Sequence, residues 1–339
     1  MLNFAIRRLA MAIPTLIFIS LIIFLLLDLA PGDPTANLPL TISHEVREQI
    51  RQSLGLGEPV HIRYVLWLKQ IVWTEPMFYL ADLGWVDAPE SARLISWQTR
   101  APVMDTILER LPQTLKVVGL SYVVGVLIAL PIGIISAYRQ YSVFDQVGTF
   151  VSMVGYSVPP FFSGVLAIVI FSVLIPRDSI FWLPSIYDTT LQVVDWESFK
   201  LQARQMVMPV MVLALQTTAQ ISRFMRASML DNLNQDYVRT ARAKGLTESV
   251  VVMVHVLRNS MIPVVTVIAL GIPSIFGGAI ITEQVFKVNG IGQYLIVAIQ
   301  ANDMPTVQTI TFLFAFLIVM FNLIADLLYG VLDPRIRYD

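Results

Sequence analysis

Residues 231–263, DNLNQDYVRTARAKGLTESVVVMVHVLRNSMIP, form the one long polar and basic interruption between two apolar runs in the second half of this chain. Leading into this stretch, an apolar residue recurs at every fourth position: Met225, Met229, Leu233 and Tyr237. That period predicts a helix with one apolar stripe. Glycine is the usual residue just past a helix C-terminus, so Gly245 is expected to end the helix in a left-handed turn. The stretch therefore predicts a helix, a glycine turn and a second helix, with a surface suited to binding another protein.

The composition places this stretch in a membrane protein. Of the 339 residues, 56% are hydrophobic and only 14% are charged, whereas soluble domains are about 25% charged. The mean hydropathy is +0.69. The chain has no cysteine, which excludes disulfides, thiol nucleophiles and cysteine metal sites. The three histidines form no ligand cluster in the sequence, so we expect no metal site, no bound cofactor and no catalytic residue.

Six apolar runs approach or exceed the roughly 20 residues that cross a bilayer core, which predicts an all-α polytopic membrane protein with six transmembrane helices. They cover about residues 9–29, 113–138, 146–176, 205–224, 259–282 and 304–330. Pro159–Pro160 predicts a kink or break in the third run. The fifth run has a similar set of interruptions: Gly271, Pro273, Gly277 and Gly278. Such residues can be mere packing devices, but two interrupted spans together favour a translocation path.

The density of Lys and Arg orients the spans. With the N-terminus inside, the segments on that side are about twice as rich in these residues as the opposite segments, so both termini are expected to be cytoplasmic. Residues 225–258 then form a cytoplasmic loop, and residues 30–111 form an extracytoplasmic subdomain inserted after the first helix. Within that subdomain, the apolar period predicts helices over 43–54 and 61–72.

Several short stretches resemble one family along nearly the whole chain. They are DYVRTARAKGL at 236–246, followed by LRN at 257–259, together with APGDP at 30–34, ERLPQTL at 109–115, SVPPFF at 157–162, EQVFKVNGIGQ at 283–293 and DPRIRY at 333–338. These sequences resemble those of the oligopeptide/dipeptide branch of the permease subunits of binding-protein-dependent ABC importers. With Gly245 as anchor, Ala241 and Leu257 match the general loop pattern of that family. The departures from that pattern are Arg239, Thr240, His255 and Arg258, and residues 74–99 form a longer region than the family counterpart.

The resemblance implies a membrane-spanning subunit that translocates di- or oligopeptides across a bacterial or archaeal inner membrane. It implies three kinds of protein partner in addition to membrane lipid: a second homologous permease subunit, two ABC ATPase subunits that hold ATP and Mg²⁺, and an extracytoplasmic solute-binding protein. It implies no nucleic acid. Relatives that carry nickel, opines or oligosaccharides leave the substrate open, as does the choice between a homodimer and a heterodimer of permeases.

The resemblance also assigns a role to the loop around Gly245, as the surface that couples to the ATPases. Tyr237 is expected to act as an apolar knob, Ala241 to permit close approach and Gly245 to make the turn. The charged contacts around them are assigned to Asp236, Arg239, Arg242 and Lys244. Leu257 completes the set as the match to the family leucine.

Two other function classes remain to be weighed. The chain has no G-x-x-x-x-G-K-[ST] sequence, so ATP hydrolysis is expected in a separate subunit. A stand-alone secondary transporter or channel is the alternative, but no ionisable residue lies at the centre of a predicted span, which argues against ion coupling. A membrane enzyme is poorly supported, because the carboxylate pairs Asp82 with Asp87 and Asp105 with Glu109 are more economically interpreted as solvated surface charges.

Overall fold

The computed structural model describes residues 2–29, 57–89, 91 and 93–332, so the helix predicted over 43–54 lies outside the described residues. In the described parts the named elements are helical, and an isolated antiparallel bridge joins Ile95 to Pro102. The chain divides into two compact units. The first comprises Pro112–Gln293 with Phe321–Asp339, and the second comprises Leu2–Leu111 with Tyr294–Met320.

Among the described residues, four helical stretches are long and apolar enough to cross a membrane: Ile6–Asp28, Val103–Tyr138, Glu248–Phe276 and Met304–Leu327. The first lies in α1 (Leu2–Asp28) and the last in α16 (Met304–Leu332). The second joins α5 (Val103–Thr114), η2 (Leu115–Gly119) and α6 (Leu120–Tyr138). The third joins α11 (Glu248–Val250), η4 (Val251–Val256), α12 (Leu257–Gly271) and α13 (Pro273–Phe276). These stretches confirm the all-α polytopic class.

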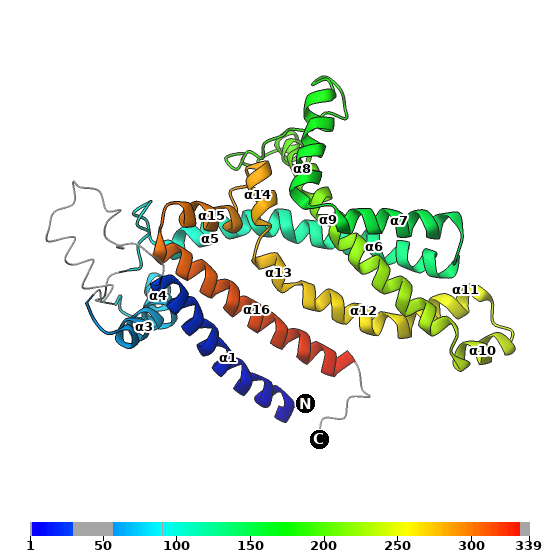
Figure 1. Cartoon of the computed structure of the whole chain (residues 1–339), viewed down its shortest axis with the longest axis horizontal. Helices are drawn as coiled ribbons and strands as arrows, with labels where there is room; N and C mark the ends of the chain where they lie inside the picture. The colour runs from blue at the N-terminus through cyan, green and yellow to red at the C-terminus, as the bar shows by residue number, and fades with distance from the viewer. Residues whose placement is uncertain (1, 30–56, 90, 92, 333–339) are drawn as a thin grey trace. The chain divides into compact units, whose positions relative to one another are not determined.

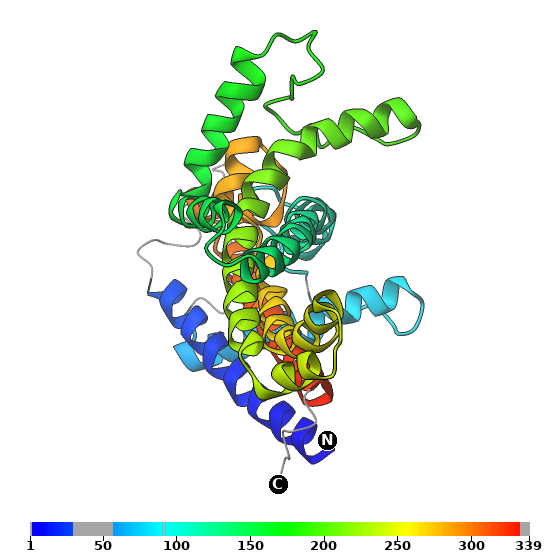
Figure 2. The same ribbon diagram turned by 90° about the vertical axis from the view of Figure 1, so that its right-hand side faces the viewer.

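The two prolines of the third predicted run break it as expected. Helix α7 (Val143–Ser157) ends there, and α8 (Pro160–Ile168), which continues into η3 (Val169–Leu174), leaves it at an angle of 101° (Figures 1 and 2). Val158 and Pro159 are both extended, because a residue that precedes proline is driven away from the helical region. Counted as one bent span, the pair is a fifth crossing.

The remaining predicted run, 205–224, lies inside α9 (Trp196–Leu233), a continuous helix of 38 residues. This helix begins with a capping box, in which Asp195 Oδ1 accepts from the Ser198 amide at 2.7 Å and Ser198 Oγ accepts from the Asp195 amide at 3.0 Å. Because uncharged polar residues lower its hydropathy, α9 is not among the helices apolar enough to be counted as spans. The count of six therefore stays a prediction.

In the first unit, α6, α7 and α12 all pack against α9 (Figure 1). Glycines allow the close approach. A Cβ built on Gly133 of α6 would lie 2.6 Å from Met225 Cβ, and one built on Gly155 of α7 would lie 3.0 Å from Leu215. Small residues at such crossings let helix backbones approach closely. The result is a tightly packed group of helices with α9 as its shared element.

The interrupted fifth run ends in a buried carboxylate. After α13, Gly278 adopts a φ of +70°, and α14 (Ile280–Phe286) begins. Glu283 in α14 is fully buried, and its carboxylate accepts from Thr114 Oγ1 at 3.1 Å and from the Gln293 amide at 2.9 Å. A Cβ on Gly290 would lie 2.6 Å from the Glu283 carboxyl carbon. The glycines of the 283–293 stretch therefore make room for this carboxylate.

The second unit contains α1, the short helices α3 (Val60–Lys69), η1 (Gln70–Thr74) and α4 (Glu75–Asp82), and the start of α16. The helix predicted over 61–72 is confirmed by α3 and η1. Phe24, Trp67 and Phe312 pack together in a small aromatic core. Helix α15 (Ile291–Gln300) leads to Asp303, which is fully buried and accepts from the Trp97 amide at 3.0 Å.

Candidate docking surface

The loop that the sequence singles out contains a short helix, α10 (Asp236–Ala243), which is separate from α9. The prediction of one helix running through Tyr237 is therefore wrong. Side-chain amides explain the break, because those of Asn232, Asn234 and Gln235 donate to backbone carbonyls four residues earlier. Such local bonds compete with helical hydrogen bonding and favour helix ends.

One side of α10 is buried against its own unit. Val238 is fully buried and Ala241 is 6% exposed, and both pack into the core beneath α10 with Met225 and Met229 of α9. The same core contains further apolar residues of η4 and its neighbours: Val251, Val252, Val256 and Leu257. Ala241 is thus buried and Leu257 partly buried in the core beneath α10.

The other side of α10 is exposed, and we call it the α10 surface: Asp236, Tyr237, Arg239, Arg242, Lys244 and Gly245. Tyr237 is 37% exposed, and its hydroxyl donates to Asn232 Oδ1 at 2.8 Å. Arg239 and Asp236 form a loose ion pair of 3.5 Å, with side chains 74% and 96% exposed. Pairs of this kind contribute little to stability, so these side chains are available to a partner.

Gly245 ends α10 in the predicted left-handed turn, with a φ of +78°. Its amide donates to the Arg242 carbonyl at 2.9 Å, and the Leu246 amide donates to the Ala241 carbonyl at 3.4 Å. This is the Schellman pattern, in which a glycine satisfies the last carbonyls of a helix. A Cβ built on Gly245 would meet no atom within 4 Å, so the surface above the turn is open.

A second ion pair closes the turn on its far side. Arg242 Nη2 donates to Glu248 Oε1 at 2.6 Å, and Arg242 Nε donates to Glu248 Oε2 at 3.0 Å. The two side chains are 44% and 41% exposed. Because a bidentate arginine–carboxylate pair fixes orientation as well as distance, it holds the end of α10 against the start of α11.

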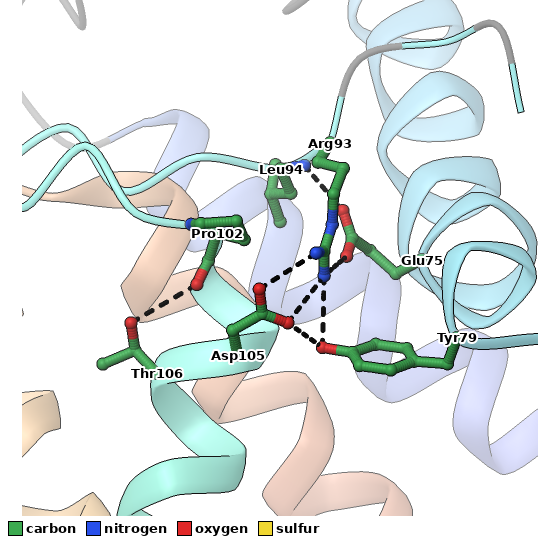
Figure 3. Close-up of polar contacts among 7 residues, drawn as sticks. All are labelled: Glu75, Tyr79, Arg93, Leu94, Pro102, Asp105 and Thr106. Atoms are coloured by element: carbon green, nitrogen blue, oxygen red, sulfur yellow. Dashed lines mark hydrogen bonds and ion pairs between the residues drawn. The ribbon is translucent and has the colours of Figure 1, made fainter. Parts of the chain in front are cut away.

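Sequence reasoning missed a polar cluster in the second unit, which we call the Arg93 cluster: Glu75, Tyr79, Arg93 and Asp105 (Figure 3). Arg93 donates to both oxygens of Asp105, at 2.8 and 2.9 Å, and to Glu75 Oε2 at 3.3 Å. Asp105, which we interpreted as a solvated surface charge, is 39% exposed and is also ion-paired with Arg93. Glu75 and Tyr79 lie one turn apart in α4, but irregular chain separates them from Arg93 and Asp105, so no sequence period could have revealed the whole cluster.

Further hydrogen bonds link the members of the Arg93 cluster, and burial affects the pKa of Tyr79. Tyr79 donates to Asp105 Oδ1 at 2.5 Å, and the Leu94 amide donates to Glu75 Oε1 at 2.6 Å. Burial raises the pKa of Tyr79 to about 12, with a further contribution from Asp105, so the hydroxyl stays a donor at neutral pH. The cluster joins α4, the 93–102 segment and the start of α5 (Figure 3).

The described parts of the chain contain no group of three or more histidines and carboxylates that could hold a metal ion. The α10 surface presents exposed cations and a tyrosine on a short helix whose buried residues, Val238 and Ala241, pack in the core beneath it.

Two family models match the chain. The model described as binding-protein-dependent transport system inner membrane component matches residues 129–338, and the N-terminal model of binding-protein-dependent transport system membrane components matches residues 1–118.

Curated proteins match over the full length. An oligopeptide transport system permease protein, AppB of Bacillus subtilis strain 168, is 37% identical over 339 residues that cover all of both chains. A dipeptide transport system permease protein, DppB of Escherichia coli K12, is 36% identical over 354 residues, covering all of this chain and 99% of the relative. A putative peptide transport system permease protein of Brucella abortus strain 2308 is 34% identical and covers 98% of each chain.

A solved structure shares the fold. The crystal structure of an amino acid ABC transporter with histidines matches with a TM-score of 0.50 and 14% sequence identity, covering 67% of this chain and 94% of the other. At this identity the match speaks for the fold alone.

Proposed function

The chain belongs to the family of binding-protein-dependent transport system inner membrane components, and on that premise we propose that its α10 surface docks an ABC ATPase subunit. The chain is the membrane-spanning permease subunit of an ABC importer. Hydrolysis of ATP, with its Mg²⁺, takes place in the partner. Family membership favours this function over a stand-alone carrier or channel.

The cargo is a di- or oligopeptide. The relatives reported above are named as oligopeptide, dipeptide and putative peptide permeases, and each aligns with this chain over essentially its whole length. These names support peptides over nickel, opines or oligosaccharides. The peptide is delivered by an extracytoplasmic binding protein, and a second homologous permease subunit completes the translocation path.

The observation that carries the docking proposal is the contrast between the two sides of α10. Val238 and Ala241 anchor the helix in an apolar core, while Arg239 and Lys244 stand exposed around an open glycine turn. A short helix anchored in this way can be displaced by a bound partner without unfolding, and its displacement then moves the core that it shares with α9. With α10 in the cytoplasm, both chain termini lie on the same side as the ATPases.

A pair of glycine variants tests this proposal. Gly245→Asp places a side chain in the open space above the turn, while Gly84→Asp makes the same change at another open glycine with a similar φ of +75°. The two changes impose comparable backbone strain, but only the first alters the α10 surface.

We expect both variants to insert in the membrane. Gly245→Asp should lower recovery of the ATPase subunits by about tenfold and uncouple ATP hydrolysis from uptake, as expected for a blocked interface centre. Gly84→Asp should retain both. Co-purification from mild detergent and ATP-dependent peptide uptake in liposomes give the two readouts. Normal uptake by Gly245→Asp would overturn the docking assignment.

A further inference from the structure

An ion pair links α9 to the start of α7. Arg226 Nε donates to Asp145 Oδ1 at 2.6 Å, and Arg226 Nη2 donates to Asp145 Oδ2 at 2.8 Å. The side chain of Asp145 is 4% exposed and that of Arg226 is 27% exposed. The Tyr141 amide also donates to Asp145 Oδ2 at 2.9 Å, so the same carboxylate holds the turn that precedes α7.

The Asp145–Arg226 pair lies beside the part of α9 that contributes Met225 and Met229 to the core beneath α10. Met225 and Met229 are fully buried in the core beneath α10, together with Val238. Arg226 is the next residue along the helix after Met225, so its side chain leaves α9 about 100° around the axis. At one level, α9 thus contributes to the core beneath α10 on one face and holds α7 on another.

Further contacts keep α7 and α9 in register beyond the pair. Ser152 Oγ lies 3.2 Å from Ser222 Oγ, and Gly155 lies against Leu215. The Arg223 guanidinium lies 4.5 Å from the centre of the Tyr156 ring. From Asp145 with Arg226, through Ser152 with Ser222, to Gly155 with Leu215, the contacts run in opposite directions along the two helices, so α7 is antiparallel to α9 and ends at the 101° bend into α8.

We propose that Asp145 and Arg226 are positioning residues, which carry a displacement of α10 through α9 into α7 and so to the bend before α8. The proposal rests on the proposed function, since it takes the ATPase as the source of that displacement. Apolar packing alone allows side chains to slide, whereas a bidentate charged pair fixes both distance and orientation. The buried position of the Asp145 carboxylate keeps water from taking the place of the guanidinium.

The test compares substitutions that keep or remove this link. Asp145→Asn keeps the shape and removes the charge, whereas Asp145→Glu keeps the carboxylate. Glu197→Gln is the matched control, because it removes a carboxylate from another ion pair of α9, the exposed one with Lys200. Each permease is assembled with its partner permease, ATPases and binding protein, and peptide uptake per ATP hydrolysed is measured in liposomes.

We expect Asp145→Asn to assemble with the ATPases in normal yield and to hydrolyse ATP, while uptake per ATP falls by about tenfold. Asp145→Glu should recover part of that loss, and Glu197→Gln should match the wild type. In the double variant Asp145→Asn/Arg226→Gln, uptake should be no lower than in Asp145→Asn, because both changes remove one interaction.

The outcomes separate this proposal from the one on which it rests. If Asp145→Asn takes up as much peptide per ATP hydrolysed as the wild type, the proposed role of the Asp145–Arg226 pair is wrong. The docking role proposed for the α10 surface would be unaffected. Loss of ATPase binding in Asp145→Asn would also overturn the role of the pair, by showing that the pair only supports the fold. A wild type that takes up peptide without ATPases would overturn both.

Discussion

The α10 surface and the Arg93 cluster are both built from arginines and carboxylates, but they differ in burial. On the α10 surface, Arg239 and Asp236 are almost fully exposed and 3.5 Å apart. In the Arg93 cluster, Glu75 is 1% exposed, and Arg93 donates to two carboxylates at once. Charges of the first kind are available to a partner, whereas charges of the second kind are used within the fold.

The difference has an energetic basis. An exposed ion pair contributes little, because water serves each charge nearly as well as its partner does. A buried pair has already lost its water, so removing one member leaves the other without compensation. Substitutions in the two regions should therefore have opposite signatures: loss of stability in the Arg93 cluster and loss of partner binding at the α10 surface.

The largest effect is expected for Arg93→Met, which keeps much of the side-chain volume and removes the guanidinium. Among the described residues, Glu75 would retain the Leu94 amide as a donor and lose the guanidinium, so the free energy of unfolding should fall by about 3 kcal/mol. Thermal unfolding of the purified chain in detergent measures this loss. Arg100→Met is the control, since Arg100 is exposed in the same segment. Equal midpoints for the two variants would contradict a structural role for the cluster.

Ala241→Leu tests whether Ala241 belongs to the core beneath α10 or to the α10 surface. Ala241 faces the core beneath α10, so a leucine would overpack that core and lower the free energy of unfolding by about 2 kcal/mol. Tyr237→Leu, one turn earlier at a residue that is 37% exposed, should leave stability nearly unchanged. The same unfolding measurement serves for both. If Ala241→Leu instead kept full stability and lost only ATPase binding, Ala241 would belong to the docking surface.

Gly245→Ala should have a smaller effect, about 1 kcal/mol, because alanine is strained at a φ of +78° although nothing crowds its Cβ. Gly245→Asn should cost less, since asparagine tolerates the left-handed region. Unfolding midpoints in detergent rank the three proteins. Equal unfolding midpoints for the Gly245→Asn and Gly245→Ala variants would show that the loss of stability does not come from backbone strain.

The smallest change in stability is expected for Arg239→Ala, about 0.5 kcal/mol or less, because its pair with Asp236 is exposed. Its effect should appear in ATPase binding, which should weaken and become less sensitive to salt, since one charged contact is lost. Titration of the ATPase against the permease at two ionic strengths checks this. An unchanged affinity would remove Arg239 from the α10 surface.

Local chemistry explains what the sequence could predict. Apolar runs predicted the long helices, Pro159–Pro160 predicted the break before α8, and Gly245 predicted the left-handed turn, because each signal resides in a few neighbouring residues. The break between α9 and α10 depends on amide side chains that donate to backbone carbonyls. The four-residue spacing from Met229 to Tyr237 therefore wrongly predicted one continuous helix. The pairings of Arg93 with Asp105 and of Arg226 with Asp145 depend on the tertiary fold, and no short window of sequence contains them.

The open space above Gly245 has an evolutionary consequence. The side chains that surround this turn share few contacts with the core beneath α10, and that core is filled from the other side of the helix by Val238 and Ala241. A lineage can therefore exchange residues on the α10 surface one at a time without loss of the folded permease. If the α10 surface docks the ATPase as we propose, duplicated transporters can diverge in this way until each permease accepts its own ATPase and rejects its sister's.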